Sequence, residues 1–351
     1  MYTSFNQDYQ KVVEKSASEY TKDSKVETSS IVVEPYTSKI LAIIGGKDYA
    51  SSQFNRATQA NRQIGSTIKP LLYYLALENG FTPATTFLCE PTTFKLDDNS
   101  TYSPSNFNDK YAYKDVTLAQ AIAVSDNIFA VKTHLFLGTD NLASLIKKFG
   151  IKDVKANASL ALGTLNTNIY NLANMYNCLA SEGKYNHLYT IEKITNDAGK
   201  VLYQHEQEDK QLLEQDSCLE LSQLLTSTFN STFSTYLQAT MASYQLDNIN
   251  ACKTGSTDVD NLAVAYNPQV LVASWVGYDD NRKMETADDK TVAKKTVIDV
   301  LNYTNENKDV TWYQPTEDLQ QIAINPLTGD FDENGTVYWL SLIHISEPPR
   351  L

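Results

Sequence analysis

The stretch Arg62–Gly80 most constrains the fold of this chain, because it combines a helix start with a reactive pair of side chains. Its apolar spacing predicts a buried helix that opens at Ser66 and closes before Gly80, which can take the left-handed conformation of a helix cap. Pro70 falls in the first turn, where its missing N–H breaks no helical hydrogen bond. The residues expected on the apolar face are Ile68, Leu71, Leu72, Leu75 and Ala76.

Ser66 and Lys69 are three residues apart, and we therefore expect them side by side at the mouth of this helix. A serine in that place has an amine, free backbone N–H groups and the positive end of the helix dipole beside it, which together activate an acyl-transfer nucleophile. The same spacing recurs at Ser144–Lys147 and Ser181–Lys184. An N-cap serine followed by a solvated lysine would explain it equally well, so the interpretation depends on further motifs.

Two such motifs follow in order, Ser125-Asp-Asn127 and Lys253-Thr-Gly255. The first interrupts a helical pattern that begins at residue 117, and the second ends a β-rich run. Ser-x-Asn is common by itself and also occurs at Ser4-Phe-Asn6. The conjunction is specific, because a helix mouth, an interhelical loop and a strand each supply one part of a nucleophile-and-base site.

The remaining pattern alternates strands and helices. The strands predicted from β-rich runs and turn residues are 30–34, 39–44, 188–194, 200–203, 248–254, 263–266 and 270–278. The predicted helices are 5–22, 117–124, 128–136, 141–149, 169–181, 215–229 and 292–301, of which the first is polar and has no core of its own. The long irregular connection over residues 81–116 is of the kind that lines a site.

Composition excludes several classes of protein. Hydrophobic residues make up 42% and charged residues 20% of the 351 residues, which is typical of a soluble globular protein. A net charge of −13 offers no basic surface for nucleic acid. The four cysteines lack metal-ligand spacing and are expected to be buried free thiols, with a single disulfide left open. No run of about twenty apolar residues and no signal-peptide pattern occurs in the sequence.

Several longer segments accompany the three motifs. They are Ile31–Gly46, Phe54–Gln59, Arg62–Pro70, Tyr102–Asn106, Ala161–Gly163 and Ser274–Tyr278. Over roughly residues 3–330 the chain resembles the penicillin-binding transpeptidases of cell-wall synthesis, in particular the bifunctional class A enzymes. The resemblance implies a mixed α/β fold of the β-lactamase and DD-peptidase kind, in which helices flank an antiparallel sheet and the site lies between the sheet and an all-helical lobe.

The resemblance also implies roles for the motif residues. Ser66 would attack the carbonyl of a D-Ala-D-Ala stem peptide, and Lys69 would take its proton, although the general base in this family is debated. Ser125 would pass a proton to the leaving amine. Asn127 would hold the substrate amide, and Lys253 would oppose the substrate carboxylate and keep a positive field over the site.

The strand motif supplies the rest of the implied site. Thr254 is expected beside the substrate, and Gly255 would let the peptide backbone approach the strand closely. The backbone N–H groups of Ser66 and Ser256 would form the oxyanion hole. The resemblance implies no metal and no cofactor.

The predicted organisation has four parts. Residues 1–26 form a helix and linker from a truncated upstream region, 27–305 the transpeptidase domain, 306–339 the start of a C-terminal appendage, and 340–351 a non-native tail. The implied partners are stem peptides and β-lactam antibiotics, with a cell-wall synthesis complex as a possible third. The implied location is extracytoplasmic, with membrane attachment through an N-terminal anchor that this sequence lacks.

Two other functions use the same motifs. A DD-carboxypeptidase or β-lactamase would employ water as the acyl acceptor, but no glutamate lies between Asn127 and Glu182 to activate it, which weakens the β-lactamase alternative. A penicillin-binding sensor or scaffold would be acylated, or would merely bind, without turnover. The complete set of motif side chains argues against an inactive scaffold and leaves the sensor open.

Overall fold

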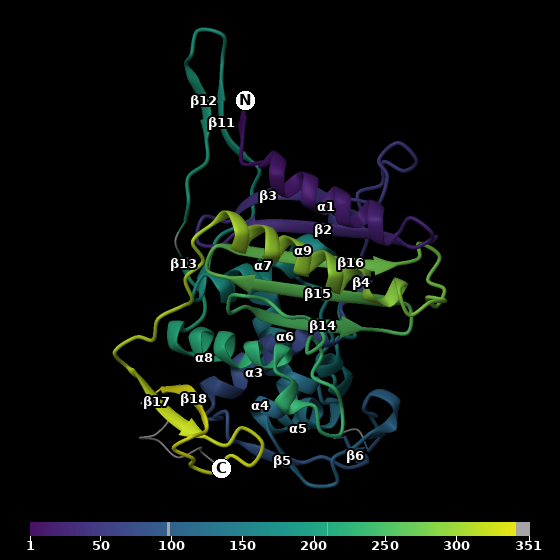
Figure 1. Ribbon diagram of the computed structural model, residues 1–351, viewed down its shortest axis with the longest axis vertical. Coiled ribbons are helices and arrows are strands. Elements are labelled where there is room, and N and C mark those ends of the chain that lie inside the picture. Colours follow the sequence, from purple (N-terminus) through teal and green to yellow (C-terminus); the bar gives the residue numbers. More distant parts are fainter. Residues whose placement is uncertain (97–98, 209, 342–351) are drawn as a thin grey trace.

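A five-stranded antiparallel sheet forms the centre of the molecule (Figure 1). The computed structural model describes residues 1–96, 99–208 and 210–341. In spatial order the strands are β14 (Ala251–Ser256), β15 (Asp260–Asn267), β16 (Val270–Gly277), β2 (Glu27–Glu34) and β3 (Lys39–Ile44). All eight residues of β16 are buried, because helices cover both faces of the sheet. The antiparallel sheet, the flanking helices and the helical lobe expected from the resemblance are all present.

The central sheet pairs a strand from the N-terminal part of the chain with one that lies more than two hundred residues later. Strand β2 pairs antiparallel with β16, with Ile31 opposite Ala273. Two buried hydroxyls of this junction are paired, since Thr28 donates to the carbonyl of Trp275 over 2.7 Å and Ser30 lies 2.9 Å from the hydroxyl of Ser274, whereas the hydroxyl of Ser29 has no partner among the described residues. Hairpins predicted over 30–44 and 188–203 are confirmed as β2–β3 and as β11 (Ile191–Thr195) with β12 (Val201–Gln204).

Helices α1 (Gln7–Tyr20) and α9 (Val292–Asn307) lie side by side on one face of the sheet (Figure 1). Tyr9, Val13 and Ala17 of α1 are buried there, and the Tyr9 hydroxyl lies 3.0 Å from the hydroxyl of Thr304 in α9. The polar helix predicted near the N-terminus therefore contributes to a core that it shares with the sheet.

The opposite face carries the helical lobe. Its helices are α3 (Lys69–Glu78), α4 (Leu118–Val124), α5 (Asn127–Leu137), α6 (Thr139–Lys148), α7 (Ile169–Ala180) and α8 (Gln215–Leu225). Helix α3 was expected to bury one face, but Tyr73, Tyr74 and Leu77 are buried as well, because α5, α6 and α8 surround it. Gly80, at φ +84°, follows its end as predicted.

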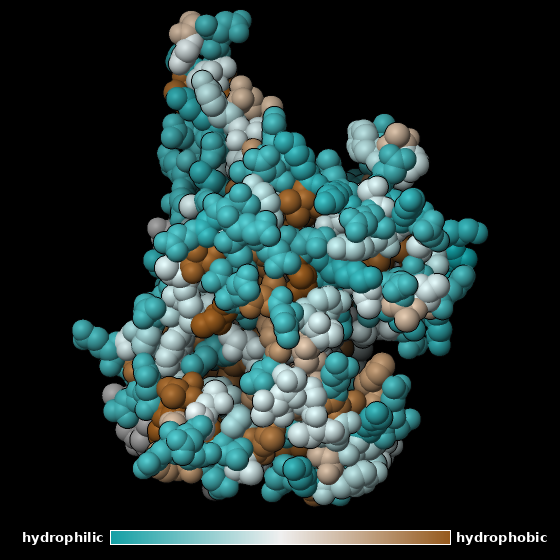
Figure 2. All heavy atoms as spheres, viewed as in Figure 1, coloured by the Kyte–Doolittle hydropathy of each residue, from teal (hydrophilic) through white to brown (hydrophobic). Residues whose placement is uncertain are grey.

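The short elements connect these layers. They are β1 (Tyr2–Thr3), α2 (Arg56–Gln59), β4 (Arg62–Gln63), β5 (Thr86–Leu88), β6 (Phe94–Lys95), β7 (Thr101–Tyr102), β8 (Asp115–Thr117), β9 (Asn166–Thr167), β10 (Lys184–Tyr185) and β13 (Lys210–Gln211). Single 3₁₀ turns are η1 (Gly65–Ile68), η2 (Phe107–Asp109), η3 (Ala158–Leu162), η4 (Thr226–Phe229), η5 (Ser231–Phe233) and η6 (Asp289–Thr291). Hairpin β11–β12 projects from the body in both views of the molecule (Figures 1 and 2).

A C-terminal hairpin, β17 (Leu319–Ile324) and β18 (Thr336–Ser341), packs on α8. The Ser341 amide donates to the Glu220 carboxylate over 2.7 Å, and burial raises the pKa of Glu220 to about 8. Hydrophobic side chains show on the surface near this hairpin in Figure 2. The predicted boundary between 305 and 306 stays a prediction. Of the predicted tail, residues 340 and 341 belong to β18 and 342–351 lie outside the described residues.

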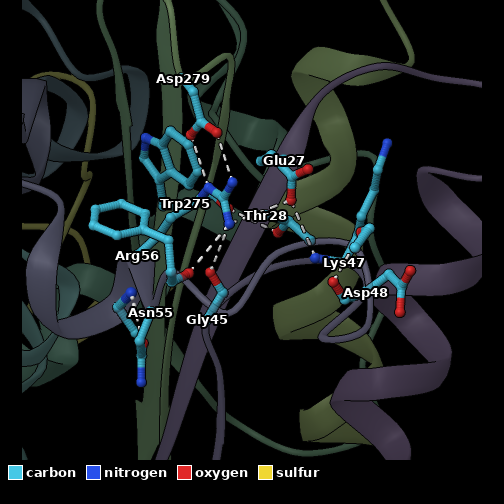
Figure 3. A network of polar contacts seen from close by, with 12 residues as sticks. Glu27, Thr28, Gly45, Lys47, Asp48, Asn55, Arg56, Trp275 and Asp279 are labelled. Carbon is cyan, nitrogen blue, oxygen red and sulfur yellow. Dashed lines mark hydrogen bonds and ion pairs between the residues drawn. The ribbon is translucent and has the colours of Figure 1, made fainter.

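Arg56 ties the loop ahead of the nucleophile to the sheet (Figure 3). Its Nε and Nη2 atoms donate to both oxygens of Asp279 over 2.8 and 2.6 Å. Nη1 donates to the carbonyls of Gly45 and Phe54 and lies 3.6 Å from a carboxylate oxygen of Glu27. Because this guanidinium is only 3% exposed and both ends of its planar fork are engaged, it fixes the path of the chain into α2.

The four cysteines are free and buried, which confirms the predicted thiols. Within the part of the chain that the structure describes, no helix is both long and apolar enough to cross a membrane.

Candidate active site

A cavity of about 630 Å³ brings the three sequence motifs together at the junction of β14 and the helical lobe. Five of the predicted site residues line it, and these are Ser66, Ser125, Asn127, Thr254 and Ser256. Lys69 and Lys253 lie behind the wall and are fully buried, and Gly255 is packed against the nucleophile turn.

Ser66 sits in the turn η1, one residue after Gly65, which has φ +53°. A Cβ on Gly65 would stand 2.8 Å from the carbonyl oxygen of Ser256, so a side chain there would push η1 away from β14. The sequence predicted that the helix opens at Ser66. In the structure the first turn is 3₁₀, and α3 begins only at Lys69, with Pro70 inside its first turn as predicted.

Arg62 fixes the approach to this turn. Its guanidinium forms hydrogen bonds to Asp260, with an Nη2–Oδ1 distance of 2.7 Å, and donates to the carbonyl of Tyr278 over 2.9 Å. The indole N–H of Trp275 donates to the same carboxylate oxygen over 2.9 Å. The nucleophile turn is thereby anchored to strands β15 and β16, which do not themselves line the cavity.

Lys69 points toward the loop between α4 and α5. Its Nζ donates to the carbonyls of Ser125 and Asp126 over 2.8 and 3.0 Å and to Oδ1 of Asn127 over 2.8 Å, and it lies 3.3 Å from Oγ of Ser125. Among the described residues it makes no hydrogen bond to Ser66, and the predicted place of Ser66 beside Lys69 stays a prediction. Burial lowers the pKa of Lys69 to about 7, which gives it a neutral amine near physiological pH.

Ser125 occupies a strained backbone position. It ends α4 with φ 60° and ψ 44°, the left-handed region that residues other than glycine, asparagine and aspartate seldom adopt. Helix α5 begins two residues later at Asn127, so the Ser125 side chain is held in the gap between the two helices. Such strain persists where the surrounding contacts fix it, and it is frequent at functional sites.

Lys253 is the second lysine whose amine lies beside the hydroxyl of Ser125. Its Nζ donates to Oγ of Ser125 over 2.9 Å and to the carbonyl of Thr254 over 2.8 Å. Burial, with a further contribution from the neighbouring charge of Lys69, lowers the pKa of Lys253. Oγ of Ser125 therefore lies between two amines whose protonation is linked through their proximity.

Asp126 is a buried side chain whose role the sequence did not reveal. Its carboxylate caps α5 by accepting from the amide of Phe129 over 2.7 Å. It also accepts from Nδ2 of Asn106 over 2.6 Å, from the hydroxyl of Tyr236 over 2.7 Å and from the thiol of Cys89 over 2.8 Å. The segment that ends at Asn106 had contributed only to the resemblance, because a contact between residues twenty positions apart leaves no local pattern.

Asn127 is engaged at both ends of its amide. Oδ1 accepts from Lys69, and Nδ2 donates to the carbonyl of Ser105 over 2.7 Å. Its backbone N–H donates to Oδ1 of Asn106 over 2.7 Å. The side chain is thus oriented before any substrate binds.

Replacing Asp126 with alanine is expected to lower the free energy of unfolding by roughly 2–4 kcal/mol, because a helix cap is lost and buried donors are left unpaired. Urea denaturation followed by circular dichroism measures this change. Asp140→Ala is the matched control, since Asp140 is an exposed carboxylate in the first turn of α6. Equal stability of the two variants would contradict the role assigned to Asp126.

Gly255 is required by close neighbours within the chain, while its predicted role in the approach of a peptide backbone stays a prediction. A Cβ at this position would lie 2.5 Å from the carbonyl oxygen of Ile64 and 2.9 Å from a methyl carbon of Thr67. The close approach that the glycine permits is therefore that of η1 to β14. On either side of it, Thr254 and Ser256 face the cavity, and the Ser256 hydroxyl donates to Asn261 over 2.6 Å.

No aspartate or glutamate of the described residues lines the cavity. Glu182, the first glutamate after Asn127, accepts hydrogen bonds from Tyr36 and Gln215 outside it. The described part of the site thus offers lysine and serine side chains for proton transfer and no carboxylate on the lining.

Sequence comparisons agree with this geometry. The family described as "Penicillin binding protein transpeptidase domain" matches residues 28–288. Penicillin-binding protein 2D of Bacillus subtilis (strain 168) is 37% identical over 334 residues, which cover 94% of this chain and 48% of that protein. Penicillin-binding protein 1A of Aquifex aeolicus (strain VF5) is 33% identical over 312 residues, which cover 86% of this chain and 41% of that protein. The chain therefore spans less than half the length of these relatives.

Solved structures share the fold. Penicillin-binding protein 1A from Haemophilus influenzae superposes with a TM-score of 0.81 at 22% identity, over 93% of this chain and 55% of that one. The PonA1 protein from Mycobacterium tuberculosis, in complex with penicillin V, superposes with a TM-score of 0.76 at 19% identity, over 95% of this chain and 91% of that one. The resemblance seen in the motifs is confirmed, and the chain belongs to the penicillin-binding protein transpeptidase family.

Proposed function

We propose that this chain is a serine DD-transpeptidase domain that cross-links peptidoglycan stem peptides through an acyl-enzyme on Ser66, and that penicillin acylates the same residue. One observation supports it above the others, namely the position of Oγ of Ser125 between the amines of Lys69 and Lys253 on the wall of the Ser66 cavity. This arrangement can move a proton from an attacking hydroxyl to a leaving amine.

Acylation begins when Oγ of Ser66 attacks the carbonyl carbon of the penultimate D-alanine. The neutral amine of Lys69 accepts the hydroxyl proton, and a new C–O bond forms as the tetrahedral oxyanion develops. Backbone N–H groups of Ser66 and Ser256 donate to that oxyanion. The C–N bond then breaks, and Ser125 gives its proton to the departing D-alanine while it recovers one from Lys69. Substrate approach has to bring Lys69 and Ser66 together, as often happens when an open site closes on its ligand.

The other motif residues hold the reactants. The amine of Lys253 donates to Oγ of Ser125 and so orients that hydroxyl, and when protonated it favours an anionic substrate. The amide of Asn127 borders the cavity and can exchange its hydrogen bond to Ser105 for one to the donor peptide. Thr254 and Ser256 lie along the strand edge on which the peptide backbone extends, with Gly255 between them.

The second half-reaction regenerates Ser66. An amine from a neighbouring stem peptide attacks the ester carbonyl and loses its proton to Ser125 and Lys69. The C–O bond to Ser66 breaks as the amide cross-link forms, and Lys69 returns the proton to Oγ of Ser66. Water is the competing nucleophile, but no carboxylate of the described residues lines the cavity to activate it. Persistence of the acyl-enzyme until an amine arrives therefore follows from the side chains present.

The acyl-enzyme formed with penicillin is accordingly expected to last tens of minutes or longer. Each tenfold increase in the lifetime of the acyl-enzyme corresponds to about 1.4 kcal/mol of activation barrier for its hydrolysis. Without a general base to activate water, we therefore expect the lifetime to be longer by orders of magnitude. Intact-mass spectrometry after a penicillin chase measures the lifetime. Loss of the adduct within seconds, with catalytic consumption of penicillin, would show a β-lactamase instead.

A peptide thioester distinguishes the remaining alternatives. A transpeptidase releases the acyl group faster as an acceptor amine is added and forms an amide product. A carboxypeptidase releases it to water at a rate that the amine does not change, and a sensor keeps it. Of these outcomes only the first supports the proposed function.

The substrate sets the place of action. Stem peptides of the wall lie outside the cytoplasmic membrane, so the domain works there, attached to the membrane through a segment of a longer protein. A cell-wall synthesis complex and the β-lactams are the partners that fit this place, and the chemistry needs neither metal nor cofactor.

A further inference from the structure

A lysine outside the three motifs faces the active-site cavity. Lys294 lies in the first turn of α9, and its side chain lines the same cavity as Ser66 and Ser125. Lys69 and Lys253 are fully buried behind the wall. Lys110, the other described lysine on the lining, is an exposed side chain of the irregular connection. A bound molecule can therefore contact the side chain of Lys294 directly, whereas that of Lys253 is not on the lining.

Lys294 is held beside the helix that ends at Ser125. Its Nζ donates to the carbonyl of Thr240 over 2.9 Å, and the amide of Thr240 donates to the carbonyl of Ala123 in α4 over 3.0 Å. This is the one hydrogen bond of the Lys294 ammonium within the described ranges, where it has no acidic partner. Two of its three N–H donors are thus open to a ligand.

The neighbouring lysine provides a contrast. Lys295 lies 3.8 Å from a carboxylate oxygen of Asp288 and over the ring of Tyr20, on the side of α9 away from the cavity. Lys294 has no such compensation, and it lies in the first turn of a helix, where the positive end of the dipole disfavours a cation. A poorly compensated ammonium in this position is expected to attract an anion.

The electrostatic surroundings place that anion near the strand motif. The charge of Lys294 contributes to lowering the pKa of Lys253, which is consistent with the two amines lying near one another, and burial lowers the pKa of Lys294 itself. Lys253 already donates to Ser125 and to the Thr254 carbonyl, both inside the wall. Lys294 lies on the cavity lining together with the side chain of Thr254, whereas Lys253 does not, so an anion in the cavity can contact Lys294 directly.

We propose that Lys294 binds the terminal carboxylate of the acyl donor, and the corresponding carboxylate of a penicillin, while Lys253 acts on the reaction chiefly through Ser125. This inference rests on the proposed function and names a specificity-determining residue for it. The ligand chemistry is a peptide or β-lactam with a free carboxylate next to the bond that breaks. A neutral analogue gains nothing from this contact.

Benzylpenicillin and its methyl ester test the contact, because they differ only in the charge of that carboxylate. Intact-mass spectrometry gives the second-order rate constant for adduct formation with each probe. In Lys294→Met the ratio of the acid rate to the ester rate is expected to fall about tenfold or more relative to the unchanged chain, as for loss of a charge-assisted hydrogen bond. Lys294→Arg should keep most of the ratio, and Lys295→Met should keep all of it.

The ratio separates binding from folding, since both probes meet the same protein. An unchanged ratio in Lys294→Met, or an equal fall of both rates, would overturn the inference and leave the proposed function intact. If the unchanged chain forms no adduct on Ser66 with either probe, the proposed function fails and the inference falls with it. A fall in the ratio of the acid rate to the ester rate in Lys294→Met, with no change of that ratio in Lys295→Met, would support the inference.

Discussion

Ser66→Ala is expected to abolish covalent labelling by penicillin, with no residual adduct above background. The cavity lining contains two other motif serines, but Oγ of Ser125 is held between two lysines and the Ser256 hydroxyl is bound to Asn261. Ser66 lies on the cavity wall in the 3₁₀ turn that leads into the buried helix α3. Intact-mass spectrometry and peptide mapping of the labelled chain measure the loss.

Two serines with the same Ser-x-x-Lys spacing serve as controls. Ser144 is exposed on α6, and Ser144→Ala should leave labelling unchanged. Ser181 is buried and accepts a hydrogen bond from the amide of Tyr36, so Ser181→Ala should change stability and not labelling. An adduct that survives in Ser66→Ala would refute the assignment of the nucleophile.

Lys69→Ala should slow acylation by roughly 10²–10⁴-fold at pH 7, the usual contribution of a general base. The pH dependence follows from its pKa, which burial lowers to about 7. As pH rises through that value the neutral, proton-accepting amine becomes the major form, so acylation of the unchanged chain should rise and level off about one unit above it. Stopped reactions with penicillin across this pH range, analysed by mass, give the profile.

A lysine on α5 provides the matched control for this change. Lys132 donates to the carbonyl of Leu88 outside the cavity, and Lys132→Ala should keep both the rate and the pH profile. Near-normal acylation by Lys69→Ala at pH 7 would show that another group accepts the proton from Ser66.

The motif residues could be predicted from the sequence because their chemistry is carried by residue type and short spacing. Ser66, Ser125 and Ser256 all line one cavity. Ser125 lies 59 positions after Ser66, and Ser256 lies more than twice that number of positions after Ser125. The positions of most strands and helices could be predicted as well, because hydrophobic periodicity and turn residues are local signals in the sequence. The resemblance then supplied the architecture that local signals leave undetermined.

Packing between distant segments accounts for what the sequence did not predict. Gly255 was assigned to substrate approach, but the atoms that exclude a side chain there belong to Ile64 and Thr67. Asp126 and Lys294 carried no pattern, because their partners come from the loops around Asn106, Tyr236 and Thr240. The hydrogen bonds of Lys69 to the loop around Ser125 were not predicted either, because the two segments are more than fifty positions apart in the sequence.

The pairing of β2 with β16 also has a consequence for how the chain acquires its shape. Ile31 lies opposite Ala273, so the central strands can pair only after nearly the whole domain has left the ribosome. Contacts so distant in sequence make folding slow, and the unpaired edge of β2 remains open to other chains until β16 arrives. The strand that carries Lys253 joins this sheet through β15 and β16, so a chain interrupted before β16 cannot complete the candidate active site.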